Sequence, residues 1–383
     1  MTTYKFNMKK NFLIIINERK SSFLLFLFIL CFCIILPAPI ITYGTQLILL
    51  AITVIIITIT SKKINLKSFF YIFIISFFIL TLTYIQSTYL RHQQILWLQS
   101  IRVCFWISCC IIIYNEIIKY HPTIIKKCIE KLIFIISLSI IFQSISYYVF
   151  NIIIDYSTLL GGSNSRILYN NIFRPSGLTA EPSITSGILI SLLSIYYFFN
   201  KKFNILYLIA IVSCFLSSST IGIILASVFF LVAFTSKKNI FLILLVTPLI
   251  SIVLIPEIII RYEKLINGFD SSNNIKIDVI KNFINTKEIF YLGYGFIGKS
   301  ESAPRFYEAL YDLTAFGNSF IIFGFPIGII LFISLCLFIT TLNFSLREKS
   351  LIFLSMMKIS SPTFPFFNVF ILLLVVISKM RKK

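Results

Sequence analysis

The sequence predicts an all-α integral membrane protein whose single domain, 1–383, crosses the bilayer with about 11 or 12 helices. Of the 383 residues, 58% are hydrophobic and only 13% are charged, and the mean hydropathy is +0.95. A soluble domain of this length cannot hide so much apolar surface and still cover itself with polar groups. Apolar runs of about 20 residues recur along the chain, and each is long enough to cross about 30 Å of hydrocarbon as a helix.

Several apolar segments are candidate spans, and two regions need an argument of their own. The segment 203–235 is interpreted as two short crossings with a turn near FLSSSTIG, because one crossing would place Lys237 and Lys238 outside. The last segment is too long for one simple span and too short for two, and its prolines predict a tight or re-entrant hairpin. The candidate spans lie at about 23–43, 45–60, 68–88, 99–118, 132–153, 183–200, 203–218, 219–235, 239–256, 317–342 and 351–378.

Clusters of lysine and arginine between these segments predict how the chain is threaded. The segment Met1–Lys20 is basic and has no small-residue cleavage site, so we expect it to stay in the cytoplasm, with no removable signal peptide. Alternation from there puts the uncharged turns Tyr43–Gly44 and Ser217–Ser219 outside. The basic residues placed inside are Lys62, Lys63, Lys67, Lys119, Lys126, Lys127, Lys131, Lys201, Lys202, Lys237, Lys238, Arg347, Lys349, Lys379, Arg381, Lys382 and Lys383. This pattern predicts a multi-pass protein of the cytoplasmic (inner) membrane, and it explains the net charge of +20 without nucleic acid.

Two long connectors, 154–182 and 257–316, are predicted to lie on the outer face. Loops of this length are usually functional or disordered. Arginine outside runs against the positive-inside bias, so its presence in these loops suggests a function. The charged residues in the two loops include Arg166, Arg174, Glu181, Arg261, Lys264, Lys299, Arg305 and Glu308.

The stretch FRPSGLTAEPSITSG at 173–187 concentrates polar residues, prolines and glycines in an otherwise apolar chain. The planar guanidinium of Arg174 suits a phosphate group, to which it donates two parallel hydrogen bonds. Glu181-Pro182 is typical of a helix start, because proline is favoured in the first turn and a carboxylate complements the helix dipole. A simpler interpretation stays open, in which Glu181 is only a capping acid and Arg174 its salt-bridge partner. Arg166 and Arg305 taken alone are typical of residues that snorkel to lipid headgroups.

Four elements of the sequence resemble the O-antigen and capsular polysaccharide polymerases of the Wzy type. RPSG at 174–177 is followed by EPS at 181–183, where a helix begins. FLSSSTIG at 215–222 is similar to the family's Leu-Thr-x-Ser-(Arg/Ser)-Thr-x-hydrophobic segment, and GYGFIG at 293–298 also matches. GNSFIIFGFPIGIILF at 317–332 is similar to the family's His-Asn followed by a Gly-rich membrane helix. The resemblance covers nearly the whole chain by topology and about 40 residues by motif.

The resemblance implies a membrane-embedded glycosyltransferase of the GT-C kind that joins undecaprenyl-pyrophosphate-linked oligosaccharides on the outer face. It implies that Arg174 and Arg305 hold the pyrophosphate and that Glu181 is the base, with Glu308 or Asp312 as alternatives. Further candidates for binding pyrophosphate or sugar are Arg166, Gly177, Arg261, Tyr307 and Asn318. Expected partners are membrane lipid and, from the same pathway, a chain-length regulator and a flippase. The sugar and its linkage are not specified.

The sequence departs from the family pattern at two places. Ten residues lie between Arg166 and Gly177, as in the family's Arg-x10-Gly pattern, whereas eleven lie between Arg305 and Gly317. Gly317 also stands where many relatives, and especially the O-antigen ligases, have histidine. Since those ligases look to depend on a loop histidine as base, its absence argues against a ligase.

One further class of protein has to be compared with the polymerase. A transporter or flippase of lipid-linked oligosaccharide would explain the helix count equally well, but such proteins usually place charges inside the bundle and show repeated halves. Here the charges gather in two unequal outer loops.

The chain has no Asp-x-Asp motif, and no loop pairs carboxylates at metal-ligand spacing, so we predict a reaction without metal or cofactor. The eight cysteines form no CxxC pair, which argues against a metal site and against a disulfide framework.

Overall fold

The computed structural model describes residues 22–60, 66–90, 93–165, 167–169, 172–234, 259, 263, 266–267, 271–297 and 313–382. Within these residues the fold is helical except for one antiparallel pair of two-residue strands, β1 and β2, so the predicted all-α class is confirmed. Four helices of the described part are long and apolar enough to cross a bilayer, namely Leu66–Ser87, Ile95–Ile117, Pro122–Phe150 and Pro182–Phe199. Shorter apolar helices are Ser22–Cys33, Pro39–Ile55, Ile205–Leu216, Thr220–Phe234, Phe325–Thr341 and Pro365–Met380. The segment 239–256 lies outside the described residues.

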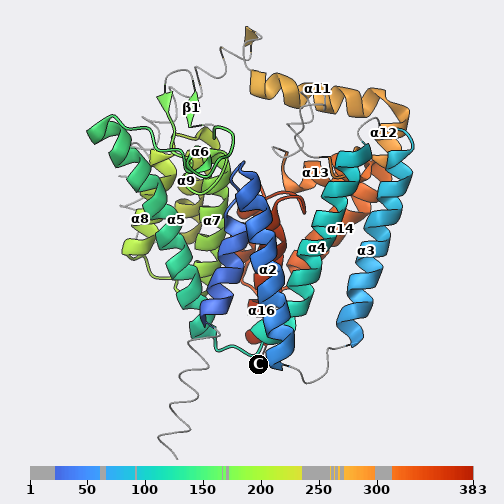
Figure 1. Cartoon of the computed structure of the whole chain (residues 1–383), viewed down its shortest axis with the longest axis horizontal. Coiled ribbons are helices and arrows are strands. Elements are labelled where there is room, and N and C mark those ends of the chain that lie inside the picture. Colours follow the sequence, from blue (N-terminus) through green and yellow to red (C-terminus); the bar gives the residue numbers. More distant parts are fainter. Residues whose placement is uncertain are drawn as a thin grey trace, which may run out of the picture.

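The elements follow one another as helices joined mostly by short connectors (Figure 1). After the helix Ser22–Cys33 they are α2 (Pro39–Thr60), α3 (Leu66–Ser87), α4 (Gln93–Ile117), α5 (Pro122–Phe150), α6 (Tyr156–Leu159), β1 (Leu168–Tyr169), β2 (Ile172–Phe173), α7 (Pro182–Phe199), α8 (Ile205–Leu216), α9 (Thr220–Phe234), α11 (Ser271–Asn285), α12 (Lys287–Leu292), α13 (Ala315–Phe323), α14 (Phe325–Thr341), α15 (Leu346–Ser355) and α16 (Pro365–Met380).

The first turn of the chain lies elsewhere than the sequence predicted. We expected spans at 23–43 and 45–60 with a turn at Tyr43–Gly44, but Tyr43 and Gly44 lie inside α2. The helix instead breaks at 34–38, before Pro39. Pro37 and Pro39 disfavour helical backbone in the residues before them and donate no N–H, which explains the break. The freed backbone of Ile35 pairs with the segment that precedes α7, donating to Leu178 at 3.0 Å and accepting from Ala180 at 2.8 Å.

Two helical hairpins match the expectation from the sequence. The region 203–235 forms α8 and α9, joined by a turn at 217–219, as predicted. The last apolar stretch forms α15 and α16, joined by the non-helical residues 356–364, which we call the tip loop. Pro362 lies in the tip loop, and Pro365 begins α16, where its missing N–H costs no helical hydrogen bond. Both ends of this second hairpin lie together, because Asn343 donates its N–H to Ser378 at 2.8 Å.

The segment 317–342 was predicted as one span, and this prediction is wrong. It forms α13 and α14, which are separated at Gly324. The backbone of Gly324 is left-handed, with φ of 78°, and a side chain there would collide with the backbone of Tyr291. Pro326 follows and cannot donate to the carbonyl of Ile322, so a continuous helix would lose a hydrogen bond at this point.

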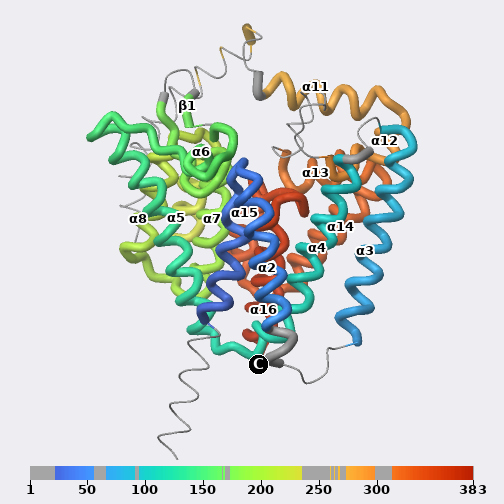
Figure 2. The backbone as a smooth tube through the Cα atoms, in the orientation of Figure 1, coloured from blue at the N-terminus to red at the C-terminus, as the bar shows by residue number. Residues whose placement is uncertain are grey.

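Helix α7 lies at the centre of the bundle, and 89% of its residues are buried. It packs against α5, α8 and α9 on one side and against α15 and α16 on the other. Figure 2 shows α15 and α16 running through the middle of the molecule, where α15 also contacts α9 and α16 contacts α4. The serines of α7 and its one glycine, Gly187, let these helices approach closely, and small residues of this kind are typical of helix contacts inside a membrane.

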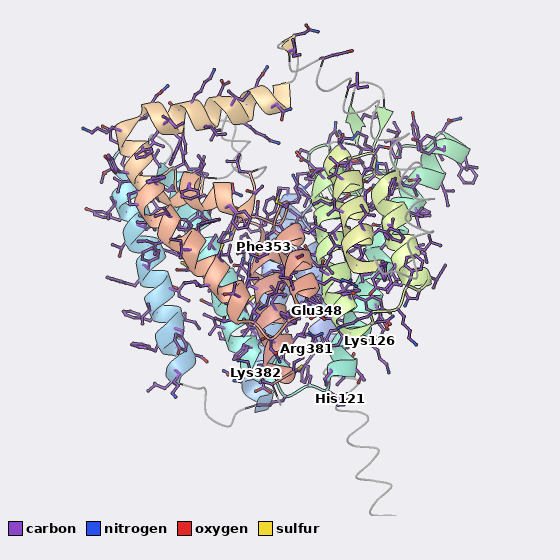
Figure 3. The ribbon with its side chains drawn as sticks, turned by 180° about the vertical axis from the view of Figure 1, so that it is seen from behind. His121, Lys126, Glu348, Phe353, Arg381 and Lys382 are labelled. Carbon is purple, nitrogen blue, oxygen red and sulfur yellow. The ribbon has the colours of Figure 1, made fainter. Side chains whose placement is uncertain are left out.

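The molecule has two chemically different ends. At the loop end, α6 and the β1–β2 pair lie beside the bundle and α11 lies across it (Figure 1). At the opposite, basic end, Figure 3 places Lys126, Glu348, Arg381 and Lys382. The buried carboxylate of Glu348 accepts hydrogen bonds from Arg381 at 2.8 and 3.0 Å. The described part of the chain therefore gathers these predicted cytoplasmic basic residues at the end opposite the first predicted outer loop.

Candidate functional site

Arg174 joins two of the segments that the sequence singled out. Its backbone N–H donates to Ile167 at 2.7 Å, which fixes the residue just after β2. Its side-chain Nε donates to the carbonyl of Ser218 at 3.1 Å, in the turn between α8 and α9. Ser218 has a positive φ of 46°, an uncommon conformation for a residue other than glycine. The half-buried guanidinium of Arg174 is thus held on the α8–α9 turn at the loop end of the bundle.

The same turn is bound to the first part of α7. The hydroxyl groups of Ser186 and Ser217 are 3.0 Å apart, and both side chains are completely buried. Ser186 also donates to the carbonyl of Pro182 at 3.0 Å, as serine does inside a helix. In α9, Gly222 faces Ser186 so closely that a side chain would collide with it. The motif at 215–222 therefore packs directly against the helix that the motif at 174–183 begins.

Gly177 forms the bend that leads from Arg174 to α7. Its φ is 57°, and an added Cβ would lie 2.8 Å from the hydroxyl of Ser139 in α5, so glycine is required on two counts. Its N–H donates to the side-chain Oε1 of Gln143 at 2.8 Å. Gln143 donates in turn to the carbonyl of Ile154 at 3.0 Å. Gln143 thus ties both ends of the segment 154–177 to α5. Gly177 was predicted to bind substrate, but its N–H is already bonded within the protein.

Glu181 is the N-cap residue of α7, as the sequence predicted, but its side chain makes no capping hydrogen bond to the helix backbone. One carboxylate oxygen accepts from the hydroxyl of Ser183 at 3.4 Å. Glu181 is half-buried and lies at the N-terminal end of α7. The geometry leaves Glu181 beside the start of α7 with no part in backbone capping.

The other two motifs also pair with each other. In GYGFIG, Tyr294 donates its N–H to Ile321 at 2.8 Å and Gly295 donates to Ile322 at 2.9 Å, at the end of α13. The side chain of Gln86 donates to the same Ile322 carbonyl at 2.9 Å. This carbonyl is free to accept both because Pro326 has no N–H to offer it.

Asn318 connects α13 to the tip loop. Its side-chain amide donates to the hydroxyl of Ser360 at 2.7 Å and to the carbonyl of Leu313 at 3.1 Å. The residue is 1% exposed, and its Oδ1 has no hydrogen-bond partner among the described residues. Asn318 and Ser360 supply polar atoms to a cavity of about 170 Å³. The cavity is otherwise mainly apolar, and its lining includes Ala315, Ile322, Leu331, Leu335 and Phe367.

The tip loop joins the two pairs of motifs into one site. On the side of α13, Met356 accepts the N–H of Ala315 at 3.1 Å, close to the bond between Ser360 and Asn318. On the side of α7, the side chain of Lys358 packs against Gly187. Lys358 is only 6% exposed. Lys358 is not among the site residues predicted from the sequence, although a lone lysine inside the apolar stretch 351–378 is itself a signal of function.

The structure describes four of the ten predicted site residues, counting the alternative bases. Arg174, Glu181, Gly177 and Asn318 lie around α7, α13 and the tip loop. The remaining candidates lie outside the described residues, namely Arg166, Arg261, Arg305, Tyr307, Glu308 and Asp312. Among the described residues, no group of three or more His, Cys, Asp or Glu side chains is arranged to hold a metal ion.

Comparison of the chain with protein-family models, with curated proteins and with solved structures finds no match.

Proposed function

We propose that the protein is a membrane glycosyltransferase that polymerises undecaprenyl-pyrophosphate-linked oligosaccharide repeat units on the outer face of the cytoplasmic membrane. The nascent chain is transferred from its lipid carrier to the non-reducing end of a new repeat unit. The product is an O-antigen, capsular or exopolysaccharide chain. In this proposal the loop end of the molecule faces outward and the basic end faces the cytoplasm.

The hydrogen bond between Arg174 and Ser218 carries the proposal. The segments at 174–183 and 215–222 were chosen by their resemblance to polymerase motifs, independently of any contact between them. The guanidinium of one reaches the backbone of the other at 3.1 Å. The segments at 293–298 and 317–332 also pair with each other through backbone hydrogen bonds. The tip loop contacts Asn318 of the second pair and Gly187 of α7, the helix that the first pair begins and packs against, and this connection supports a common site.

The chemistry that such a site supplies is stabilisation of a leaving group and removal of a proton. The acceptor hydroxyl attacks the anomeric carbon of the nascent chain, a new glycosidic C–O bond forms, and the bond to the lipid pyrophosphate breaks. The pyrophosphate leaves with the electron pair, and Arg174 stabilises its charge through a bidentate hydrogen bond. Glu181 accepts the hydroxyl proton. Direct displacement of this kind inverts the configuration at the anomeric carbon.

The other groups in this proposal come from the predicted second outer loop, from Arg166 in the first loop and from Asn318 in α13. Arg305 holds the pyrophosphate together with Arg174, and Arg166 and Arg261 support them. Tyr307 and Asn318 contact the sugar or the carrier. These assignments are carried by the resemblance alone.

The test is an assay of purified protein in liposomes with lipid-linked repeat units, in the presence of EDTA. We expect a ladder of polymer from the wild type and a loss of about 100- to 1,000-fold in rate from Arg174→Lys, which keeps the charge but loses the planar fork. Arg347→Lys, an exposed arginine at the basic end, is the matched control and should leave the rate unchanged.

Four outcomes would contradict the proposal or part of it. A wild type that moves repeat units across the bilayer without joining them is a flippase, and one that joins only finished chains to a different lipid acceptor is a ligase. A normal polymer ladder from Arg174→Lys at normal protein level would show that the 173–187 segment has only a structural role, as the start of a helix. Activity that disappears with EDTA and returns with Mg²⁺ or Mn²⁺ would remove the metal-independent part of the mechanism.

A further inference from the structure

Lys358 places a positive charge deep in the protein. It lies in the tip loop, three residues after α15 ends at Ser355, and it is 6% exposed. Charged groups at membrane depth are costly, so those that persist mark binding sites or ion pathways by default. The location of Lys358 therefore needs a functional account.

The fold makes room for this side chain on the surface of α7. An added Cβ on Gly187 would lie 2.8 Å from Cγ and 3.1 Å from Cβ of Lys358. Glycine inside a helix is less favourable than alanine, so its presence at this position goes against local preference. The absence of a side chain on Gly187 is what allows the lysine stem to lie against the helix.

Lys358 lies against α7 directly, and Arg174 is connected to the adjacent residue of α7 through the α8–α9 turn. Arg174 donates to Ser218, and the neighbouring Ser217 contacts Ser186, which directly precedes Gly187. Gly187 is five residues after the first residue of α7, or about 7.5 Å along the helix axis. The stem of Lys358, from the α15–α16 hairpin, thus lies against Gly187, next to the α7 residue that contacts the turn to which Arg174 donates.

We propose that Lys358 binds the second phosphate of the lipid-linked pyrophosphate whose first phosphate is held by Arg174. This inference rests on the proposed function. A pyrophosphate carries negative charge on two phosphates, and a single guanidinium fork matches only one of them. Lysine is a compact point charge with three rotatable donors, which suits a phosphate whose orientation is already fixed by the arginine. The hairpin that carries Lys358 also carries Ser360, so the tip loop connects this group to Asn318 and its cavity.

The experiment compares the binding of two carrier lipids, undecaprenyl pyrophosphate and undecaprenyl monophosphate, to purified protein in detergent by calorimetric titration. In Lys358→Met an unbranched side chain keeps the stem and removes the charge. We expect this variant to bind the pyrophosphate about 10- to 100-fold more weakly, as for the loss of a charged hydrogen bond, and the monophosphate with little change. Lys202→Met, an exposed lysine at the basic end, is the matched control and should bind both lipids as the wild type does.

A second pair of variants tests the geometry with the charge left in place. Gly187→Ala pushes against the lysine stem, so it should lose the same preference for pyrophosphate. Gly44→Ala, at a position in α2 with nothing within 4 Å of the added carbon, should not. A purely structural role for Lys358 would change the melting temperature without changing the ratio of the two affinities.

The outcomes separate this inference from the polymerase proposal. A wild type that prefers pyrophosphate, together with Lys358→Met and Gly187→Ala variants that keep that preference, overturns the role of Lys358 and leaves the polymerase intact. If Lys358→Met does not fold, the ratio of the two lipid affinities in Gly187→Ala alone decides whether Lys358 has this role. A wild type that binds neither lipid overturns both proposals.

Discussion

Glu348 connects three helices at the basic end, and its titration provides a quantitative test of the fold. The residue is 1% exposed. Its carboxylate accepts two hydrogen bonds from Arg381 of the C-terminal segment and one from the backbone N–H of Ser345 at 2.8 Å. Lys201, in the connector after α7, lies 3.4 Å away. Arg381 also donates to the carbonyl of Phe198 at 2.6 Å, so the network ties α7 to both ends of the α15–α16 hairpin.

The pKa of Glu348 is lowered by this network. Burial alone would raise it, but hydrogen bonds from Arg381 and Ser345 and the charges of Arg381 and Lys201 bring it from 4.5 to about 2. At about 1.4 kcal/mol for each unit between the two values, the carboxylate contributes about 3 kcal/mol to the free energy of unfolding at neutral pH. Because the folded pKa lies below the unfolded one, this contribution is complete above pH 4.5 and is lost as pH falls towards 2.

The assay is equilibrium unfolding of the detergent-solubilised protein at pH 7 and pH 3, in the wild type and in Glu348→Gln. From the two pKa values, the wild type should lose about 2 kcal/mol of this contribution by pH 3. Glu348→Gln should be less stable at pH 7 and should lack that component of the pH dependence.

The matched control is Glu116→Gln at the same end, where the partner Lys119 is exposed and the ion pair contributes at most about 1 kcal/mol. It should keep the pH dependence of the wild type. The reasoning is refuted if Glu348→Gln and the wild type lose the same free energy between pH 7 and pH 3.

Three further predictions concern the loop end. Glu181→Gln should nearly abolish chain growth while costing at most about 1 kcal/mol of stability, since the side chain makes no capping bond; a normal polysaccharide ladder on a gel would exclude it as the base. Gly177→Ala should destabilise the protein by about 1–3 kcal/mol, because alanine there is strained and meets a serine hydroxyl of α5 at 2.8 Å. Its control, Gly44→Ala, should be neutral or slightly stabilising in the same melting experiment. A topology reporter fused after Lys202 should read cytoplasmic and one near Ser163 external, and the reverse pattern would invert the assigned orientation.

Several features of the candidate site were within reach of the sequence and several were not. The pattern RPSG followed by EPS predicted that Glu181 precedes a helix, because Pro182 is compatible with the first turn and nowhere else in a helix. The contact between Arg174 and Ser218 was not predictable, since it joins residues 44 positions apart through a backbone carbonyl that has no sequence signature. Lys358 carried a readable signal, but its neighbour Gly187 gave none, because a glycine that admits a distant side chain looks like any other helical glycine.

By itself, the sequence determined the class of the fold and most of its hairpins. Apolar runs with basic connectors set the helices, and the proline positions set the break between α15 and α16, because both are local properties of the chain. At two positions the local sequence did not predict the helix break correctly. The predicted turn at Tyr43–Gly44 lies inside α2, and the break is at the prolines after Cys33. The segment 317–342 was predicted as one helix, but Gly324 divides it. Only the tertiary structure decided these positions. A broken helix is stable where another part of the chain supplies partners for its freed backbone groups. Leu178 accepts from the N–H of Ile35 and Ala180 donates to its carbonyl, and Gly295 and Gln86 donate to the carbonyl of Ile322.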